Sequence, residues 1–258
     1  THEFVATGQD DSKFGFTVSS GLASIAVERA ITSDSVELVG LHAHIGSQVF
    51  EVGAFARAVE VLAGFAAPFG LAELSVGGGL GVPYVEGESA PSITEWAAGI
   101  RAVCEGAGVT ASVSAEPGRS IVAAAAVTLY TVGTIKDLPG IRTYVSVDGG
   151  MSDNPRPVLY GSGYETFLPR AAAADRSRPV RVVGKHCESG DLLVREGWVP
   201  ADLAVGDVLS TPVTGAYGHA MGSNYNHVLR PAVVFVADGD ARTVVRRETF
   251  EDLVRREV

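Results

Sequence analysis

The sequence contains little cysteine and little lysine. Cys104 and Cys187 are the only cysteines in 258 residues, too few and too widely spaced for a disulfide framework or a zinc-binding pattern. We therefore predict no metal site and a reduced, cytoplasmic setting. Lysine occurs at three positions, Lys13, Lys136 and Lys185, which restricts the choice of a lysine for covalent chemistry.

Long apolar runs are also missing. None approaches the roughly 20 residues that a membrane-spanning helix needs, so we expect no membrane partner. The net charge of -10 repels phosphate backbones and argues against a nucleic-acid partner. Because 46% of the residues are hydrophobic and 19% charged, the chain can bury the core of one large domain or two ordinary ones.

The first half of the sequence alternates strand and helix patterns. Apolar runs predict strands over residues 36–43, 72–76 and 109–115. Between them, apolar residues recur at helical spacing over residues 52–69 and 93–107. Ser92 and Glu95 form a capping box, which predicts that the second helix begins there. Alternating strands and helices predict a parallel sheet with crossover helices.

From about residue 122 the pattern becomes one of strands alone. Strands are predicted over residues 128–135, 142–147, 180–183 and 208–213. Asp238-Gly239 between residues 233–236 and 241–245 predicts a hairpin, and residues 251–257 a short helix. This half is therefore predicted to be a mostly antiparallel β-domain.

Polar or glycine-rich clusters directly follow the three strands of the first half, over residues 42–48, 77–81 and 116–119. The carboxyl ends of parallel strands converge on one site. Taken singly, the glycines could form a turn, His44 could be a core residue, and Glu116 could pair with Arg119. Taken together, the three glycine amides have no side chains in the way and could approach a phosphate.

These clusters occur together with Asp148–Pro157, Cys187–Asp191, Gly215–Gly218 and an opening motif from Gly8 to Phe16. In this order they resemble the barrel-type pyridoxal-phosphate decarboxylases, in particular the C-terminal portion of the diaminopimelate decarboxylase branch. The resemblance implies a partial (β/α)8 barrel followed by a mostly antiparallel β-domain. Residues 1–124 would be the C-terminal part of the cofactor-binding barrel, and residues 125–258 the β-domain.

The resemblance also implies roles for particular residues. His44 stacks on the pyridine ring, Glu116 accepts a hydrogen bond from its nitrogen, and the phosphate is held by Ser47, Gly77, Gly78, Gly79 and Gly118. Arg119 and Tyr217 contact both cofactor and substrate, and Arg156, Tyr160 and Glu188 contact the substrate. Cys187 resembles the proton donor. Homodimers with shared active sites are expected.

The implied reaction is decarboxylation of meso-2,6-diaminopimelate to L-lysine. None of the three lysines sits where the family places its Schiff-base lysine. The α/β part has about 120 residues, whereas a full barrel usually takes about 250. We therefore expect a missing upstream segment and an inactive chain without it. Three alternatives stay open: a decarboxylase of another basic amino acid or carboxylated polyamine, a non-catalytic homologue that binds a protein partner, and, less well matched, a racemase-like barrel.

Overall fold

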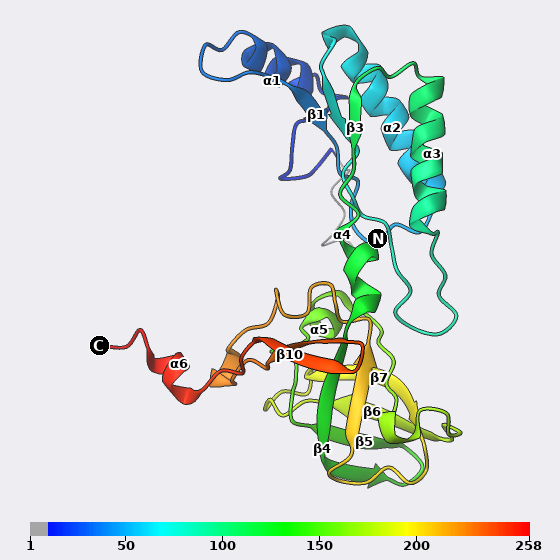
Figure 1. Ribbon diagram of the computed structural model, residues 1–258, viewed down its shortest axis with the longest axis vertical. Helices are drawn as coiled ribbons and strands as arrows, with labels where there is room; N and C mark the ends of the chain where they lie inside the picture. Colours follow the sequence, from blue (N-terminus) through cyan, green and yellow to red (C-terminus); the bar gives the residue numbers. More distant parts are fainter. Residues whose placement is uncertain (1–9) are drawn as a thin grey trace. The chain divides into compact units, whose positions relative to one another are not determined.

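The computed structural model describes residues 10–258, which fall into two compact units (Figure 1). The α/β unit comprises the chain up to Pro83 and Glu88–Ile121, and the β unit comprises Tyr84–Gly87 and Val122–Val258. The chain therefore enters the β unit for four residues, returns, and leaves the α/β unit for good after Ile121. Residues 1–9, in which the motif from Gly8 begins, lie outside the described residues.

The α/β unit is built on three parallel strands, β1 (Gly40–His42), β2 (Glu73–Ser75) and β3 (Ser112–Ser114). They pair in the order β1-β2-β3, with Leu41 beside Leu74 and Leu74 beside Val113. The parallel sheet predicted from the sequence is confirmed, although each strand is shorter than its apolar run. Helix α1 (Leu22–Ile31) was not predicted.

Two helices lie side by side and form the core of this unit (Figure 1). They are α2 (Val52–Ala66), which continues into the 3-10 turn η2 (Ala67–Phe69), and α3 (Ile93–Gly106). The Phe55 and Trp96 rings meet edge to face with centroids 5.6 Å apart. Cys104 lies in the same core cluster. Burying each large apolar side chain stabilises the fold by about 1.5–3 kcal/mol.

The ends of these helices follow from local sequence. Glu95 donates its amide to the Ser92 hydroxyl at 3.1 Å, and Ser92 donates its amide to the Glu95 carboxylate at 2.8 Å, so the predicted capping box is confirmed. The turn after α2 ends at Gly70, whose φ of 59° favours glycine.

One helical segment is long and apolar, although no apolar run of membrane-spanning length was expected from the sequence. Val52–Phe69 has a mean hydropathy of 1.4 over 18 residues and could cross a membrane by length and composition alone. Composition alone does not separate such a helix from a core helix. In the structure, Phe55, Val59 and Leu62 are buried along one side of it.

The β unit contains a five-stranded sheet in the order β7-β6-β5-β4-β8. Its strands are β4 (Val127–Leu138), β5 (Arg142–Val147), β6 (Arg178–Val183), β7 (Leu192–Val199) and β8 (Val208–Pro212). Only β5 and β6 pair in parallel. The prediction of a mostly antiparallel second half is confirmed, but β7 was not predicted.

Shorter helical elements lie before, between and after these strands. They are α4 (Gly118–Val122), η3 (Ala123–Ala125), α5 (Arg156–Tyr160), η4 (Pro169–Ala171) and η5 (Tyr225–His227). Strands β9 (Val233–Ala237) and β10 (Asp240–Val245) form the predicted hairpin. Its turn residues Asp238 and Gly239 have φ values of 53° and 86°, as a type I′ turn requires.

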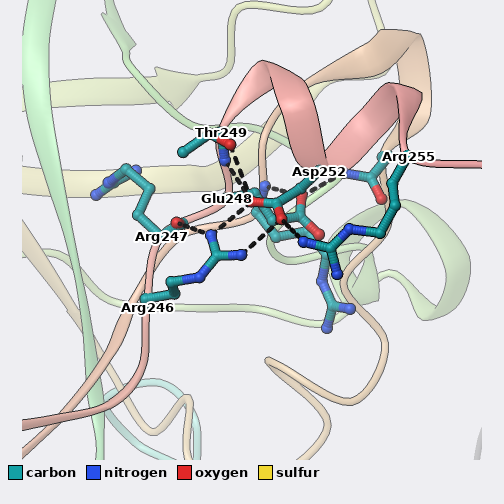
Figure 2. A network of polar contacts seen from close by, with 8 residues as sticks. Arg246, Arg247, Glu248, Thr249, Asp252 and Arg255 are labelled. Carbon is teal, nitrogen blue, oxygen red and sulfur yellow. Dashed lines mark hydrogen bonds and ion pairs between the residues drawn. The ribbon is translucent and has the colours of Figure 1, made fainter.

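The last helix, α6 (Phe250–Val254), is held by a cluster of charges (Figure 2). Arg246 reaches the Asp252 carboxylate with two nitrogens, at 2.5 and 2.6 Å, and Arg255 donates to it at 2.9 Å. Asp252 also accepts the Thr249 amide at 2.8 Å. The hydrogen bonds from Arg246 lead the interactions that hold the pKa of Asp252 well below its usual range.

Candidate functional site

The loops that follow β1, β2 and β3 touch one another. A Cβ atom added to Gly78 would lie 2.0 Å from the carbonyl oxygen of Glu116, and one added to Gly79 would lie 2.0 Å from that of Gly46. Only glycine permits such a close backbone approach at these positions. The predicted convergence of the three strand-end clusters is therefore confirmed within the α/β unit.

His44 contacts the glycine loop directly. The amide of Gly78 donates to the Nδ1 atom of His44 at 3.1 Å. Burial and the neighbouring His42 lower the pKa of His44, while Glu116 opposes them. A neutral ring that accepts at Nδ1 carries its proton on Nε2.

Two of the three glycine amides have hydrogen-bond acceptors within the α/β unit. The Gly78 amide is taken by His44, and the Gly77 amide points to the Ser75 hydroxyl at 3.4 Å. Both acceptors are uncharged side chains beside the loop. The glycines therefore serve first to pack three backbone segments together.

Glu116 is held at the end of β3 by two side chains that were not assigned a role from the sequence. His42 Nε2 lies 3.3 Å from one carboxylate oxygen, and the Ser75 hydroxyl donates to the other at 3.3 Å. His42 belongs to the cluster noted in the sequence, so its neighbourhood was the available signal. The Glu116 and His42 side chains are 59% and 50% exposed, which leaves the carboxylate accessible to a ligand.

Arg119 lies on α4 and reaches back to the loop after β1. Its Nη2 atom donates to the Ser47 hydroxyl at 2.7 Å, and the side chain is buried. Gly118, at the start of α4, has no atom within 4 Å of an added Cβ, so space is open beside it. The sequence alone also allowed Glu116 to pair with Arg119. In the structure, Glu116 instead contacts His42 and Ser75, and Arg119 contacts Ser47.

These residues suit a phosphorylated pyridine. A guanidinium and a hydroxyl are groups that bind phosphate, and the space beside Gly118 is open. A carboxylate and a neutral imidazole lie on the neighbouring loops. The donor set therefore fits pyridoxal phosphate.

Apart from Arg119, the predicted substrate residues belong to the β unit. Arg156, at the start of α5, is 4% exposed, and its Nη1 atom donates to the Tyr164 hydroxyl at 2.9 Å. Its guanidinium carbon also lies 4.4 Å from the centre of the Tyr84 ring. Burial raises the pKa of Tyr164 although Arg156 opposes this. Tyr160 ends the same helix.

Cys187 and Glu188 lie together on the loop between β6 and β7, and both are exposed. The Tyr225 hydroxyl donates a hydrogen bond to Glu188, a contact with no signal in the sequence. Tyr217 has a φ of 59°, a left-handed conformation that non-glycine residues adopt rarely.

The structure thus sorts the predicted residues into two sets. The α/β unit gathers one set at the strand ends: His44, Ser47, Gly77, Gly78, Gly79, Glu116, Gly118 and Arg119. The β unit carries the other: Arg156, Tyr160, Cys187, Glu188 and Tyr217. Within residues 10–258, no group of three or more His, Cys, Asp or Glu side chains could hold a metal ion.

Comparison with known proteins gives consistent results. Residues 1–123 match the family model described as "Pyridoxal-dependent decarboxylase, pyridoxal binding domain". A diaminopimelate decarboxylase of Actinosynnema pretiosum is 49% identical over 266 residues, which cover all of this chain and 60% of the relative. That of Bacillus subtilis is 42% identical and is also covered to 60%.

A solved structure of diaminopimelate decarboxylase from Helicobacter pylori, complexed with L-lysine, superposes with a TM-score of 0.88 at 32% identity. The match covers 99% of this chain and 63% of that one. The partial barrel followed by a β-domain is therefore the fold of this chain. The chain spans about three fifths of the length of the relatives that it matches.

Proposed function

We propose that the whole protein decarboxylates meso-2,6-diaminopimelate to L-lysine, because residues 1–123 match the pyridoxal-binding domain of the pyridoxal-dependent decarboxylases. This chain would supply part of the cofactor site and most of the substrate contacts. The observation that carries the proposal is the meeting of His44, Glu116 and the glycine loop at the carboxyl ends of three adjacent parallel strands.

Pyridoxal phosphate, when bound, accepts the electron pair that is released as carbon dioxide leaves the substrate. Glu116 would hold a proton on the pyridine nitrogen, which keeps the ring electron-poor. His44, neutral at pH 7 because its pKa is lowered, would lie against the ring without adding charge. Arg119, Ser47 and Gly118 would bind the phosphate.

The substrate end differs between decarboxylases, and Arg156 supports the choice of diaminopimelate. The distal carboxylate of diaminopimelate matches the planar fork of an arginine side chain, with which it can form two parallel hydrogen bonds. Tyr84 and Tyr164 fix the guanidinium in place, and Tyr160 and Arg119 would add donors. Glu188 would bind the distal ammonium group, and Tyr217 would contact both cofactor and substrate.

Cys187 would hold the proton that replaces the lost carboxylate. Its exposed position on the β6–β7 loop suits a side chain that completes a site on another surface. A homodimer with shared sites and a cytoplasmic location are part of the same proposal.

Two measurements test the proposal. The chain joined to a segment that supplies the cofactor-linked lysine should release carbon dioxide from meso-diaminopimelate in preference to ornithine or arginine. A preference for ornithine or arginine would overturn the substrate assignment. In the chain alone, borohydride treatment with pyridoxal phosphate should leave Lys13, Lys136 and Lys185 unmodified, whereas a pyridoxyl group on one of them would show that this chain has its own lysine.

Two other functions make different predictions. A decarboxylase of another basic amino acid or of a carboxylated polyamine would not depend on Arg156 in the same way. A non-catalytic homologue would bind a protein partner and would show no turnover even with the added segment. The retained His44, Glu116, Arg119 and Cys187 favour the catalytic proposal over this one.

A further inference from the structure

The loop from Gly184 to Asp191 connects β6 to β7 and is anchored by a buried carboxylate. Asp191 is 2% exposed. One of its oxygens accepts the amide of Met151 at 2.6 Å, and the other accepts the amide of His186 at 2.8 Å. Hydrogen bonds from amides to an ionised carboxylate are short and about twice as strong as neutral ones.

The two amides belong to different segments of the chain. Met151 lies in the segment between β5 and α5, whereas His186 directly precedes Cys187. Further bonds join the same segments: Lys185 donates its amide to the Gly149 carbonyl at 3.0 Å, and His186 Nε2 lies 2.9 Å from the Ser152 hydroxyl. The Asp191 carboxylate thus joins the loop to the segment that leads into α5, the helix that begins at Arg156.

Two glycines make room for this carboxylate. A Cβ atom added to Gly184 would lie 2.1 Å from Asp191 Oδ2, and one added to Gly150 would lie 2.8 Å from it. By contrast, nothing lies within 4 Å of a Cβ atom added to Gly190 in the same loop. The backbone therefore fits closely around the Asp191 carboxylate at Gly184 and Gly150, whereas the loop has open space at Gly190.

The outer part of the loop depends on this anchor. Cys187 and Glu188 are both exposed, so packing alone does not fix their positions. Glu188 accepts a hydrogen bond from Tyr225, whose ring lies 5.4 Å from that of His186. The buried side of the loop is formed by His186 and Asp191.

We propose that Asp191 is a positioning residue, which holds Cys187 and Glu188 in a fixed relation to the segment that leads to Arg156. The proposal rests on the proposed function for the meaning of those three side chains, but the anchor can be tested without it. An aspartate is needed because each of its two oxygens accepts a backbone N–H, whereas asparagine offers one acceptor oxygen and turns an NH2 group toward the second amide.

Backbone exchange tests the anchor directly in this chain, without cofactor or substrate. In Asp191→Asn the Met151 and His186 amides should exchange with solvent at least tenfold faster than in the unaltered chain, because each loses a charged acceptor. Ser152→Ala, a milder change, should speed exchange at His186. Unchanged exchange at both amides in Asp191→Asn would overturn the proposal.

Labelling of Cys187 reports on the functional side of the loop. In a Cys104→Ser background, the rate of Cys187 alkylation should change at least threefold in Asp191→Asn and in Gly184→Ala. Gly190→Ala, the same substitution in an open part of the loop, should leave the rate unchanged. Equal rates in Gly184→Ala and Gly190→Ala would overturn the proposal.

Turnover separates positioning from stability. In the protein completed by its lysine segment, Asp191→Asn should lower kcat at least tenfold. The control is Asp207→Asn, which removes a carboxylate that accepts the Ala204 amide and pairs with Arg170 elsewhere in the β unit. A similar loss of kcat in both variants would refute the positioning role. Absence of turnover in the unaltered protein would instead refute the proposed function and leave the exchange result standing.

Discussion

Replacing Gly78 by alanine tests whether the glycine loop is required for packing. The added methyl carbon would lie 2.0 Å from the Glu116 carbonyl oxygen and 2.8 Å from its carbon. Carbon–oxygen contacts in proteins are usually no closer than about 3.3 Å. The loops after β2 and β3 must therefore separate by more than about 1 Å, which also displaces the Glu116 carboxylate.

The energetic cost follows from this displacement. Inserting one carbon into a close-packed site typically costs about 1–3 kcal/mol, and the contact with fixed backbone places Gly78→Ala at the upper end, about 3 kcal/mol. For a protein of this size, each kcal/mol lowers Tm by about 2–4 °C. The expected fall in Tm is therefore about 6–12 °C.

Gly118→Ala is the matched control. An alanine there meets no atom within 4 Å and enters the first turn of a helix, where it is favoured over glycine by up to about 1 kcal/mol. Thermal unfolding followed by circular dichroism should show a lower Tm for Gly78→Ala and an unchanged or higher one for Gly118→Ala. If Gly78→Ala unfolds at the temperature of the unaltered chain, the close approach of these loops is not required.

Two further predictions concern single contacts. Tyr164→Phe removes the hydroxyl that accepts from the buried Arg156, and should lower the free energy of unfolding in urea by about 1.5–3 kcal/mol; no change would mean that the bond is not needed to hold the guanidinium. The pKa of His44, followed by NMR, should rise in His42→Ala and fall further in Glu116→Gln, because the neighbouring imidazole lowers it and the carboxylate raises it. Since the folded pKa is below the unfolded one, the stability that His44 contributes is complete above about pH 6.5 and declines as the pH falls below that. Shifts of the opposite sign would contradict this account.

Much of the fold follows from periodic sequence patterns. The apolar spacing that ends in Phe69 predicted α2 and its continuation, and Ser92 with Glu95 predicted the start of α3. Strand β7 was missed because Arg195, Glu196 and Gly197 interrupt the alternation where the register of its pairing shifts. Such a strand can be identified only from its pairing with β6 in the folded structure.

The site was predictable as a set of clusters but not as a set of contacts. The order of motifs identified His44, Glu116 and Arg119. Nothing in the sequence, however, predicted the hydrogen bond from Arg119 to Ser47 or the one from the Gly78 amide to His44. Pairs so far apart in the sequence depend on how strand ends align, which local patterns do not encode. Tyr225 was missed for the same reason.

The four-residue excursion from Tyr84 to Gly87 has a consequence for how this protein can be divided. The Tyr84 ring meets that of Tyr164 with centroids 5.1 Å apart and lies over the Arg156 guanidinium. A gene cut after Ile121 would therefore yield a C-terminal product without the aromatic cover of its buried arginine. The two units are interleaved along the chain. Exchanging either unit with that of a relative therefore requires residues 84–87 to stay with the β unit.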